Sequence, residues 1–186
     1  MRRESPVAVW VGPKRIKVPA LRKKREGRGT LLRNETRHRM GMDITWLTDR
    51  LAVGGGIWNS ENMAKVKSAG ITHVIDMQIE FDDRPLGLEH GVKVLWNPTD
   101  DDFEPKAAEL FRRGIDFVKV AFEEADTKVF IHCAAGVHRA PMMALAVLGW
   151  MGWDLDDAMQ LIEKRRAVAD FAAVYVQSVE DFLGKS

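Results

Sequence analysis

The one cysteine of this 186-residue chain, Cys133, is followed after five intervening residues by Arg139. The apolar run 129–131 before the cysteine predicts a strand, and the apolar run 142–151 beyond the arginine predicts a buried helix. A loop between a strand and a helix N-terminus binds anions, because its backbone amides and the helix dipole present positive charge. The same environment favours the nucleophilic thiolate form of a cysteine. Arg139 can hold a phosphate with its planar fork, and Gly136 permits a tight bend around bound oxygens.

The motif made by His132, Cys133 and Arg139, with its flanking strand and helix, resembles the signature of the cysteine-dependent dual-specificity phosphatases. The resemblance extends over about residues 43–183 and implies a phosphoric monoester hydrolase that acts on phosphotyrosine and phosphoserine or phosphothreonine of proteins. It also implies a phosphocysteine intermediate, no metal and no other cofactor. The competing interpretation is a buried structural thiol, which is the usual role of a lone cysteine. A structural thiol does not need a loop of small residues that ends in arginine, so the catalytic interpretation is favoured.

Phosphoryl transfer by a cysteine needs three groups, and this loop would supply two of them. The thiolate of Cys133 would attack phosphorus. The loop amides and the Arg139 guanidinium would stabilise charge on the phosphate oxygens. The predicted substrate-binding residues are therefore Ala134, Ala135, Gly136, Val137, His138 and Arg139.

The third group is an acid that protonates the leaving oxygen, because an alkoxide leaves poorly. In the family that the motif resembles, this acid is an aspartate on the loop after the preceding strand, at a set distance before an aromatic residue of the next helix. Three neighbouring aspartates compete for the role here. Counting back from Phe111 favours Asp101, with Asp100 second and Asp102 third.

Ala140 marks a departure from the family, in which serine or threonine usually follows the arginine. In the family that hydroxyl helps the thiolate to leave phosphorus, so the resemblance implies a slow second step but an unimpaired first step. His138 is open between a substrate contact at the rim and a plain loop residue. His132 is expected to orient the loop through hydrogen bonds.

The elements that must position the loop alternate along the chain. Apolar patterns predict strands over 44–47, 50–53, 71–77, 92–96 and 129–132. They predict helices over 60–69, 105–125, 142–151, 155–166 and 171–183, with a loop over 78–91. Asn59 or Ser60 would cap the first helix, and Asp154 the fourth. This alternation predicts an α/β fold, a compact three-layer sandwich like that of dual-specificity phosphatases, in which helices flank a central, largely parallel sheet.

Charge divides the chain into two parts. Residues 1–42 hold 13 lysines and arginines against three acidic residues, whereas residues 43–186 hold 15 against 24. We therefore expect a basic N-terminal arm followed by a catalytic domain over 43–186. The arm could be a solvated tail, fold over the acidic body, or contact nucleic acid or an anionic surface. A true start at Met40 or Met42 would remove it.

The single cysteine excludes an internal disulfide and suits a reducing compartment, so a cytoplasmic location is expected. The sequence contains no run of about 18 apolar residues, so we expect no membrane-spanning helix. The loop 133–137, together with residues 151–155 and 164–168, also resembles glucan phosphatases of the laforin type. Three functions therefore stay open: a phosphatase of proteins, a phosphatase of a non-protein substrate such as phosphoglucan, and a phosphate-binding pseudophosphatase that lacks turnover.

Overall fold

The structure, a computed structural model, describes residues 41–184. The predicted basic arm therefore lies outside the described residues except for its last two. Met42, the second of these, packs against the smaller of two hydrophobic clusters. None of the described helices is long and apolar enough to cross a membrane.

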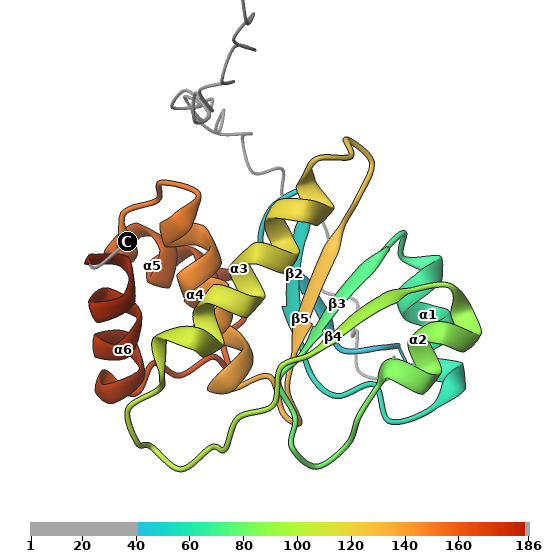
Figure 1. The fold of residues 1–186 in the computed structure, drawn as a ribbon, viewed down its shortest axis with the longest axis horizontal. Coiled ribbons are helices and arrows are strands. Elements are labelled where there is room, and N and C mark those ends of the chain that lie inside the picture. The colour runs from blue at the N-terminus through green and yellow to red at the C-terminus, as the bar shows by residue number, and fades with distance from the viewer. Residues whose placement is uncertain (1–40, 185–186) are drawn as a thin grey trace, which may run out of the picture. The chain divides into compact units, whose positions relative to one another are not determined.

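Five strands form one sheet in the order β1-β2-β5-β3-β4 (Figure 1). The strands are β1 (Ile44–Trp46), β2 (Leu51–Gly54), β3 (His73–Asp76), β4 (Lys93–Trp96) and β5 (Val129–His132). Only the edge pair β1–β2 is antiparallel, and the other three pairs are parallel. The prediction of a largely parallel sheet is therefore confirmed, with the cysteine-bearing strand at its centre.

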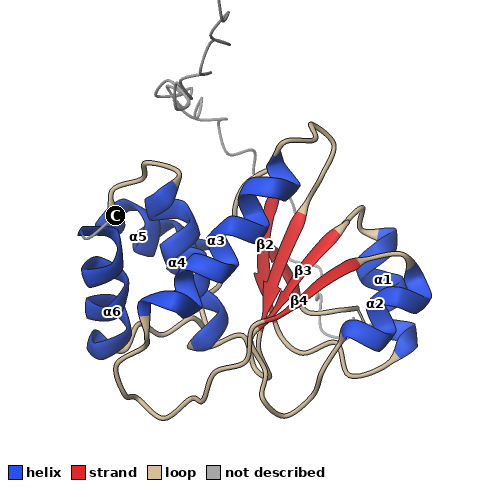
Figure 2. Ribbon diagram, viewed as in Figure 1, coloured by secondary structure: helices blue, strands red, loops and turns tan. Residues whose placement is uncertain are grey.

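Helices cover both faces of the sheet, which gives the predicted three layers (Figure 2). Two helices lie on one face, α1 (Ser60–Ser68) and α2 (Arg84–His90). Four lie on the other, α3 (Ala108–Phe122), α4 (Arg139–Trp150), α5 (Leu155–Arg165) and α6 (Ala173–Gly184). The long crossovers that parallel strands require place these helices over the sheet.

Alternate residues of each central strand enter different cores. In β5, Phe130 packs into the smaller cluster, whereas its neighbours Val129 and Ile131 pack into the larger cluster with α3, α4 and α6. Such alternation follows from the period of two along a strand. Both faces of β5 are thus buried, which fixes the position at which the strand ends and Cys133 begins the loop.

The prediction of a loop over 78–91 was wrong, because α2 occupies residues Arg84–His90. Pro85 lies in the first turn of this helix, where its missing N–H costs nothing. Gly91 ends the helix in the left-handed conformation, with φ of 65°. The residues Asp82 to Pro85 therefore lead into a helix within the predicted loop.

The other predicted helices are present with shifted ends. Asp154 caps α5 by accepting from two backbone amides, as predicted. Asn59 caps α1 by accepting from the Asn62 amide, which decides between the two candidates Asn59 and Ser60. The buried helix α4 begins at Arg139 itself, three residues earlier than predicted. The carboxyl ends of β3, β4 and β5 meet at one edge of the sheet, the lower edge in Figure 1, so the loops that follow them converge there.

Candidate active site

The Cys133 thiol lies under the loop that follows β5. Its residue is 1% exposed, and the Gly136 amide donates a hydrogen bond to Sγ over 3.2 Å. Gly136 has a φ of 65°, and a Cβ added there would lie 2.5 Å from the Gly54 carbonyl oxygen. A residue with a side chain would therefore be strained and would clash with backbone. Arg139 begins α4 directly beyond the loop.

The loop carbonyls are held from outside. The amide of Gly56 donates to the Ala134 carbonyl over 3.1 Å, and the amide of Asp170 donates to the Val137 carbonyl over 2.9 Å. In a trans peptide the carbonyl and the next N–H point in opposite directions. Carbonyls that point outward therefore turn the following amides toward the loop centre, and the bond from Gly136 to the sulfur is one instance. This is the geometry of an anion site.

Arg166 holds two further loop carbonyls. Its Nε donates to the Gly136 carbonyl over 2.7 Å and its Nη2 to the Ala135 carbonyl over 3.0 Å. The same guanidinium pairs with both carboxylate oxygens of Asp43, at 2.8 and 2.7 Å, and this pairing lowers the pKa of Asp43. The sequence did not reveal that Arg166 holds the loop or that Asp43 pairs with it. An arginine at a helix C-terminus has the same pattern as a surface charge that complements the helix dipole.

Arg139 uses three of its donors within the protein. Its Nη1 donates to Glu80 over 2.9 Å and to the Thr99 carbonyl over 3.2 Å, and its Nη2 donates to Glu80 over 2.8 Å. A guanidinium has five N–H donors, so Nε–H and the second Nη2–H remain, and they lie on one edge. The buried Nε has no hydrogen-bond partner among residues 41–184. That free edge matches the spacing of two phosphate oxygens.

Glu80, on the loop after β3, is a site residue that the sequence did not reveal. Burial works to lower the pKa of Arg139, but the hydrogen bonds to Glu80 and the nearby Cys133 raise it overall. The hydrogen bonds from Arg139 in turn lower the pKa of Glu80 to about 2. At neutral pH both members of the pair are therefore charged.

Asp101 is the aspartate of the candidate trio that lies nearest to the arginine. Its Oδ2 is 3.8 Å from Arg139 Nε, and its Oδ1 accepts from the Tyr175 hydroxyl over 3.3 Å. Burial is the main cause that raises the pKa of Tyr175, with Asp101 adding to it, so the phenol keeps its proton. All three aspartates are exposed, and Asp102 pairs with Lys106. The structure thus brings only Asp101 of these three to Arg139 within the described residues.

His138 links Asp101 to Asp170, which lies in the segment between α5 and α6. Its Nδ1 lies 3.1 Å from Asp101 and its Nε2 lies 3.3 Å from Asp170. The Phe103 ring packs edge-on against the imidazole, with centroids 5.0 Å apart. His138 is therefore more than a plain loop residue, because it holds the carboxylate of Asp101 beside the loop.

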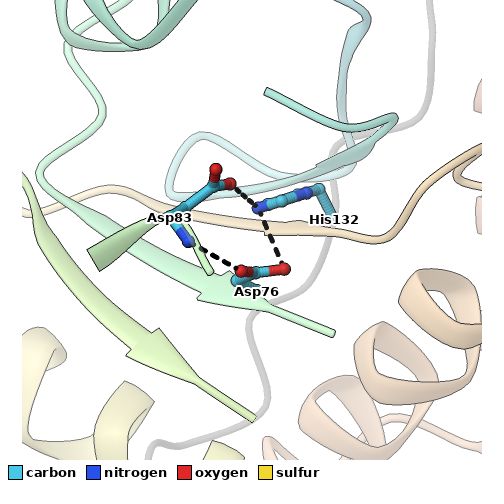
Figure 3. A group of neighbouring side chains, drawn as sticks. All are labelled: Asp76, Asp83 and His132. Carbon is cyan, nitrogen blue, oxygen red and sulfur yellow. Dashed lines mark hydrogen bonds and ion pairs between the residues drawn. The ribbon is translucent and has the colours of Figure 1, made fainter. Parts of the chain in front are cut away.

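We expected His132 to orient the loop through hydrogen bonds, but within residues 41–184 its ring makes none. Its ring faces Asp83 and Asp76, with Nε2 2.9 Å and 3.7 Å from their oxygens (Figure 3). All three side chains are fully buried. Burial raises the pKa of Asp76 to about 6, although His132 and two backbone amides, those of Gln78 and Asp83, oppose the rise. Within residues 41–184, this group is the one whose ligand atoms could share a metal ion.

Replacement of Arg166 by lysine should weaken anion binding, because a point charge cannot bridge two carbonyls and a carboxylate together. Hydrogen bonds to charged groups contribute about 1.5–3 kcal/mol each, so we expect about tenfold weaker binding of the phosphate analogue orthovanadate and a lower melting temperature. Calorimetric titration measures the affinity. Arg165→Lys, an exposed neighbour on the same helix, is the matched control. Equal affinities for the two variants would contradict the role of Arg166.

The Glu80 pair predicts a pH-dependent contribution to stability. Because the folded state lowers the pKa of Glu80 from 4.5 to about 2, the pair stabilises the fold above pH 4.5 and loses this effect as the pH falls toward 2. Urea unfolding of the protein and of Glu80→Gln should differ most in free energy near pH 6. The difference should shrink from pH 4.5 to pH 3. A difference that stays constant over that range would count against the pairing.

Known proteins resemble this chain in sequence and in fold. The family model "Dual specificity phosphatase, catalytic domain" matches residues 56–181. The amyloplastic phosphoglucan phosphatase DSP4 of Castanea sativa is 25% identical over 144 residues, which are 70% of this chain and 38% of that protein. Protein phosphatase Slingshot homolog 2 of Homo sapiens is 23% identical over 135 residues, 70% of this chain and 9% of that protein.

The chain therefore spans well under half the length of both relatives. Among solved structures, that of Tk-PTP in the active form has a TM-score of 0.68 at 18% identity and covers 77% of this chain and 98% of that one. This likeness concerns the fold. Since the family model extends over most of the sequence, the chain belongs to the dual specificity phosphatase family.

Proposed function

We propose that this protein hydrolyses phosphoric monoesters of phosphotyrosine and phosphoserine or phosphothreonine in proteins, through a phosphocysteine intermediate at Cys133. One observation carries the proposal. A buried sulfur that accepts from the Gly136 amide lies in a loop whose carbonyls are tied outward, beside the free donor edge of Arg139. A thiol, inward amides and an unpartnered arginine edge are the parts that transfer of a phosphoryl group to sulfur requires.

In the first step, the Cys133 thiolate attacks phosphorus. The S–P bond forms as the ester P–O bond breaks, and Asp101 gives its proton to the leaving oxygen. The loop amides and Arg139 stabilise the negative charge on the three equatorial oxygens. In the second step, the Asp101 carboxylate takes a proton from water, which attacks phosphorus. The S–P bond breaks, inorganic phosphate leaves and the thiolate is restored.

A phosphoglucan is the second candidate substrate, because DSP4 of Castanea sativa is named a phosphoglucan phosphatase. The name of Slingshot homolog 2 supports a protein substrate instead. We infer further that residues 43–186 form the catalytic domain and act in the cytoplasm. The 13 basic residues of 1–42 would suit contact with nucleic acid or an anionic surface.

Phosphate release from a generic aryl phosphate, a phosphopeptide panel and phosphoglucan tests the proposed function. We expect turnover of the aryl phosphate and of phosphopeptides, and no turnover by Cys133→Ser, because a serine hydroxyl stays protonated and attacks poorly. Preference for phosphoglucan over every peptide would favour the second candidate. No release from any substrate would leave a phosphate-binding pseudophosphatase, and activity of Cys133→Ser above about a tenth of normal would refute the nucleophile.

Asp101→Asn should slow the hydrolysis of alkyl phosphates by about 10²–10⁴-fold, the usual contribution of a general acid. The loss should be smaller for aryl phosphates, whose leaving group needs less help from a proton. Asp100→Asn and Asp102→Asn are matched controls on the same loop and should lose far less. A larger loss in Asp100→Asn than in Asp101→Asn would move the acid by one residue. Steady-state kinetics with both substrate classes decides between these outcomes.

Ala140 should make the second step limiting. In the described part of the chain, the Gly136 amide is the only hydrogen-bond donor to Sγ, and the buried Ala140 offers a methyl group. A hydroxyl bond to the departing thiolate is worth about 1.5–3 kcal/mol, which is about tenfold or more in rate. We expect the phosphoenzyme to accumulate and give a burst with a good leaving group.

Ala140→Ser should then raise the steady-state rate and shrink the burst. Ala144→Ser, which adds a hydroxyl to the buried face of the same helix one turn later, is the control and should do neither. Rapid-quench kinetics measures both phases. The absence of a burst together with no gain from Ala140→Ser would show that the missing hydroxyl does not limit turnover.

A further inference from the structure

Three fully buried titratable side chains meet at the carboxyl ends of β3 and β5, next to the catalytic loop. Asp76 ends β3, His132 ends β5 and Asp83 immediately precedes α2 (Figure 3). One ligand atom from each lies within 4.8 Å of the others. The proposed reaction uses none of the three.

Most of the polar atoms in this cluster lack a hydrogen-bond partner among the described residues. Both carboxylate oxygens of Asp83 and both ring nitrogens of His132 are buried and make no hydrogen bond within residues 41–184. The 2.9 Å separation of His132 Nε2 from Asp83 is short, but the two groups are not aligned for a hydrogen bond. Asp76 accepts from the amides of Gln78 and Asp83, and each carboxylate oxygen can accept again. Buried groups left in this state cost free energy, so the cluster calls for a further partner.

A proton alone does not satisfy the three groups. One imidazolium between two carboxylates leaves a buried net negative charge, and the Nε2 proton can serve only one oxygen. A divalent cation balances both carboxylates while the imidazole stays neutral, and it takes one lone pair from each ligand. Charge and donor number therefore favour a dication.

We propose that Asp76, Asp83 and His132 bind a divalent cation of the Zn²⁺ class. Atoms that lie 2.0–2.2 Å from one Zn²⁺ ion are separated by about 3–3.5 Å from each other. The nitrogen-to-oxygen distances of 2.9 and 3.7 Å bracket this range. An imidazole with two carboxylates suits Zn²⁺ better than Mg²⁺ or Ca²⁺, which prefer oxygen ligands alone.

The ion would act on structure and not on the reacting atoms. Its ligands hold both ends of the segment 77–82, which carries Glu80, and Glu80 orients Arg139 through two hydrogen bonds. The ion would also join the end of β5 to that segment, one residue before Cys133. Metal removal should therefore lower the stability of the fold and make the orientation of Arg139 less fixed. The proposed chemistry at sulfur still needs no metal.

Metal content and thermal stability test the site directly. Tag-free protein from zinc-supplemented cells should contain about one zinc per chain by mass spectrometry. Dialysis against dipicolinate should lower the melting temperature by several degrees, and Zn²⁺ should restore it. Co²⁺ added to the chelated Cys133→Ser protein should give visible absorption bands of a low-symmetry site, without any thiolate contribution. Less than about a tenth of an equivalent of zinc, no Co²⁺ band and no chelator effect would overturn the proposal in favour of a proton-sharing cluster.

Variants locate the ion. Asp83→Asn should lose most of the bound zinc and of the Co²⁺ absorption. The matched control, Asp82→Asn, removes the neighbouring carboxylate that pairs with Arg84 at the surface and should keep both. If Asp83→Asn does not fold, the Co²⁺ titration of the Cys133→Ser protein still decides whether the site exists. Equal metal content in the two aspartate variants would overturn the assignment.

Discussion

The grip of Arg166 on the carbonyls of Ala135 and Gly136 is the contact on which the active site depends. Arg166 is only 5% exposed, and a buried guanidinium carries a large desolvation cost that only good geometry and further hydrogen bonds offset. Here the bidentate pair with Asp43 and two carbonyl acceptors supply both. Because the carbonyls are held outward, the amides of the loop turn inward, beside the guanidinium of Arg139. The contacts of Arg166 in the protein interior thus orient the amides that produce a positive potential at the loop centre.

The site also holds negative charge close to where a negatively charged substrate would bind. In the proposed reaction the site attracts a phosphate dianion, yet the carboxylates of Glu80 and Asp101 are both close to Arg139. A third carboxylate, that of Asp170, contacts His138. The geometry reconciles these demands, because Glu80 takes the end of the guanidinium and leaves the Nε edge free. Its carboxylate fixes the plane of Arg139 before substrate arrives, which lowers the entropy lost on binding. Asp101 faces that same edge, where a proton donor must stand when an ester oxygen leaves.

Local pattern was enough to predict the cysteine loop, its strand and helix, the N-caps at Asn59 and Asp154, and the largely parallel sheet. It failed where the decisive contact joins distant parts of the chain. Arg166 and Asp43 are 123 residues apart and Arg139 and Glu80 are 59 apart, so no periodicity relates them. The helix α2 was missed for another reason. Asp82 to Pro85 reads as a turn, and only the burial of Gly87 against β4 shows that the segment continues as a helix.

Because Ala140 has no hydroxyl, the rate of the proposed second step should depend on the rigidity of the loop. A mobile hydroxyl can follow the sulfur as charge returns to it, whereas a backbone amide and a helix dipole act only from fixed positions. With Gly136 as the one donor to Sγ in the described residues, stabilisation of the thiolate depends on how well that amide is held. The contacts of Arg166, Gly56 and Asp170 with the loop carbonyls, and the close approach of Gly136 to Gly54, hold it. Electrostatic preorganisation of this kind costs no reorganisation during the reaction, so the scaffold around the loop takes over part of what a side chain would otherwise do.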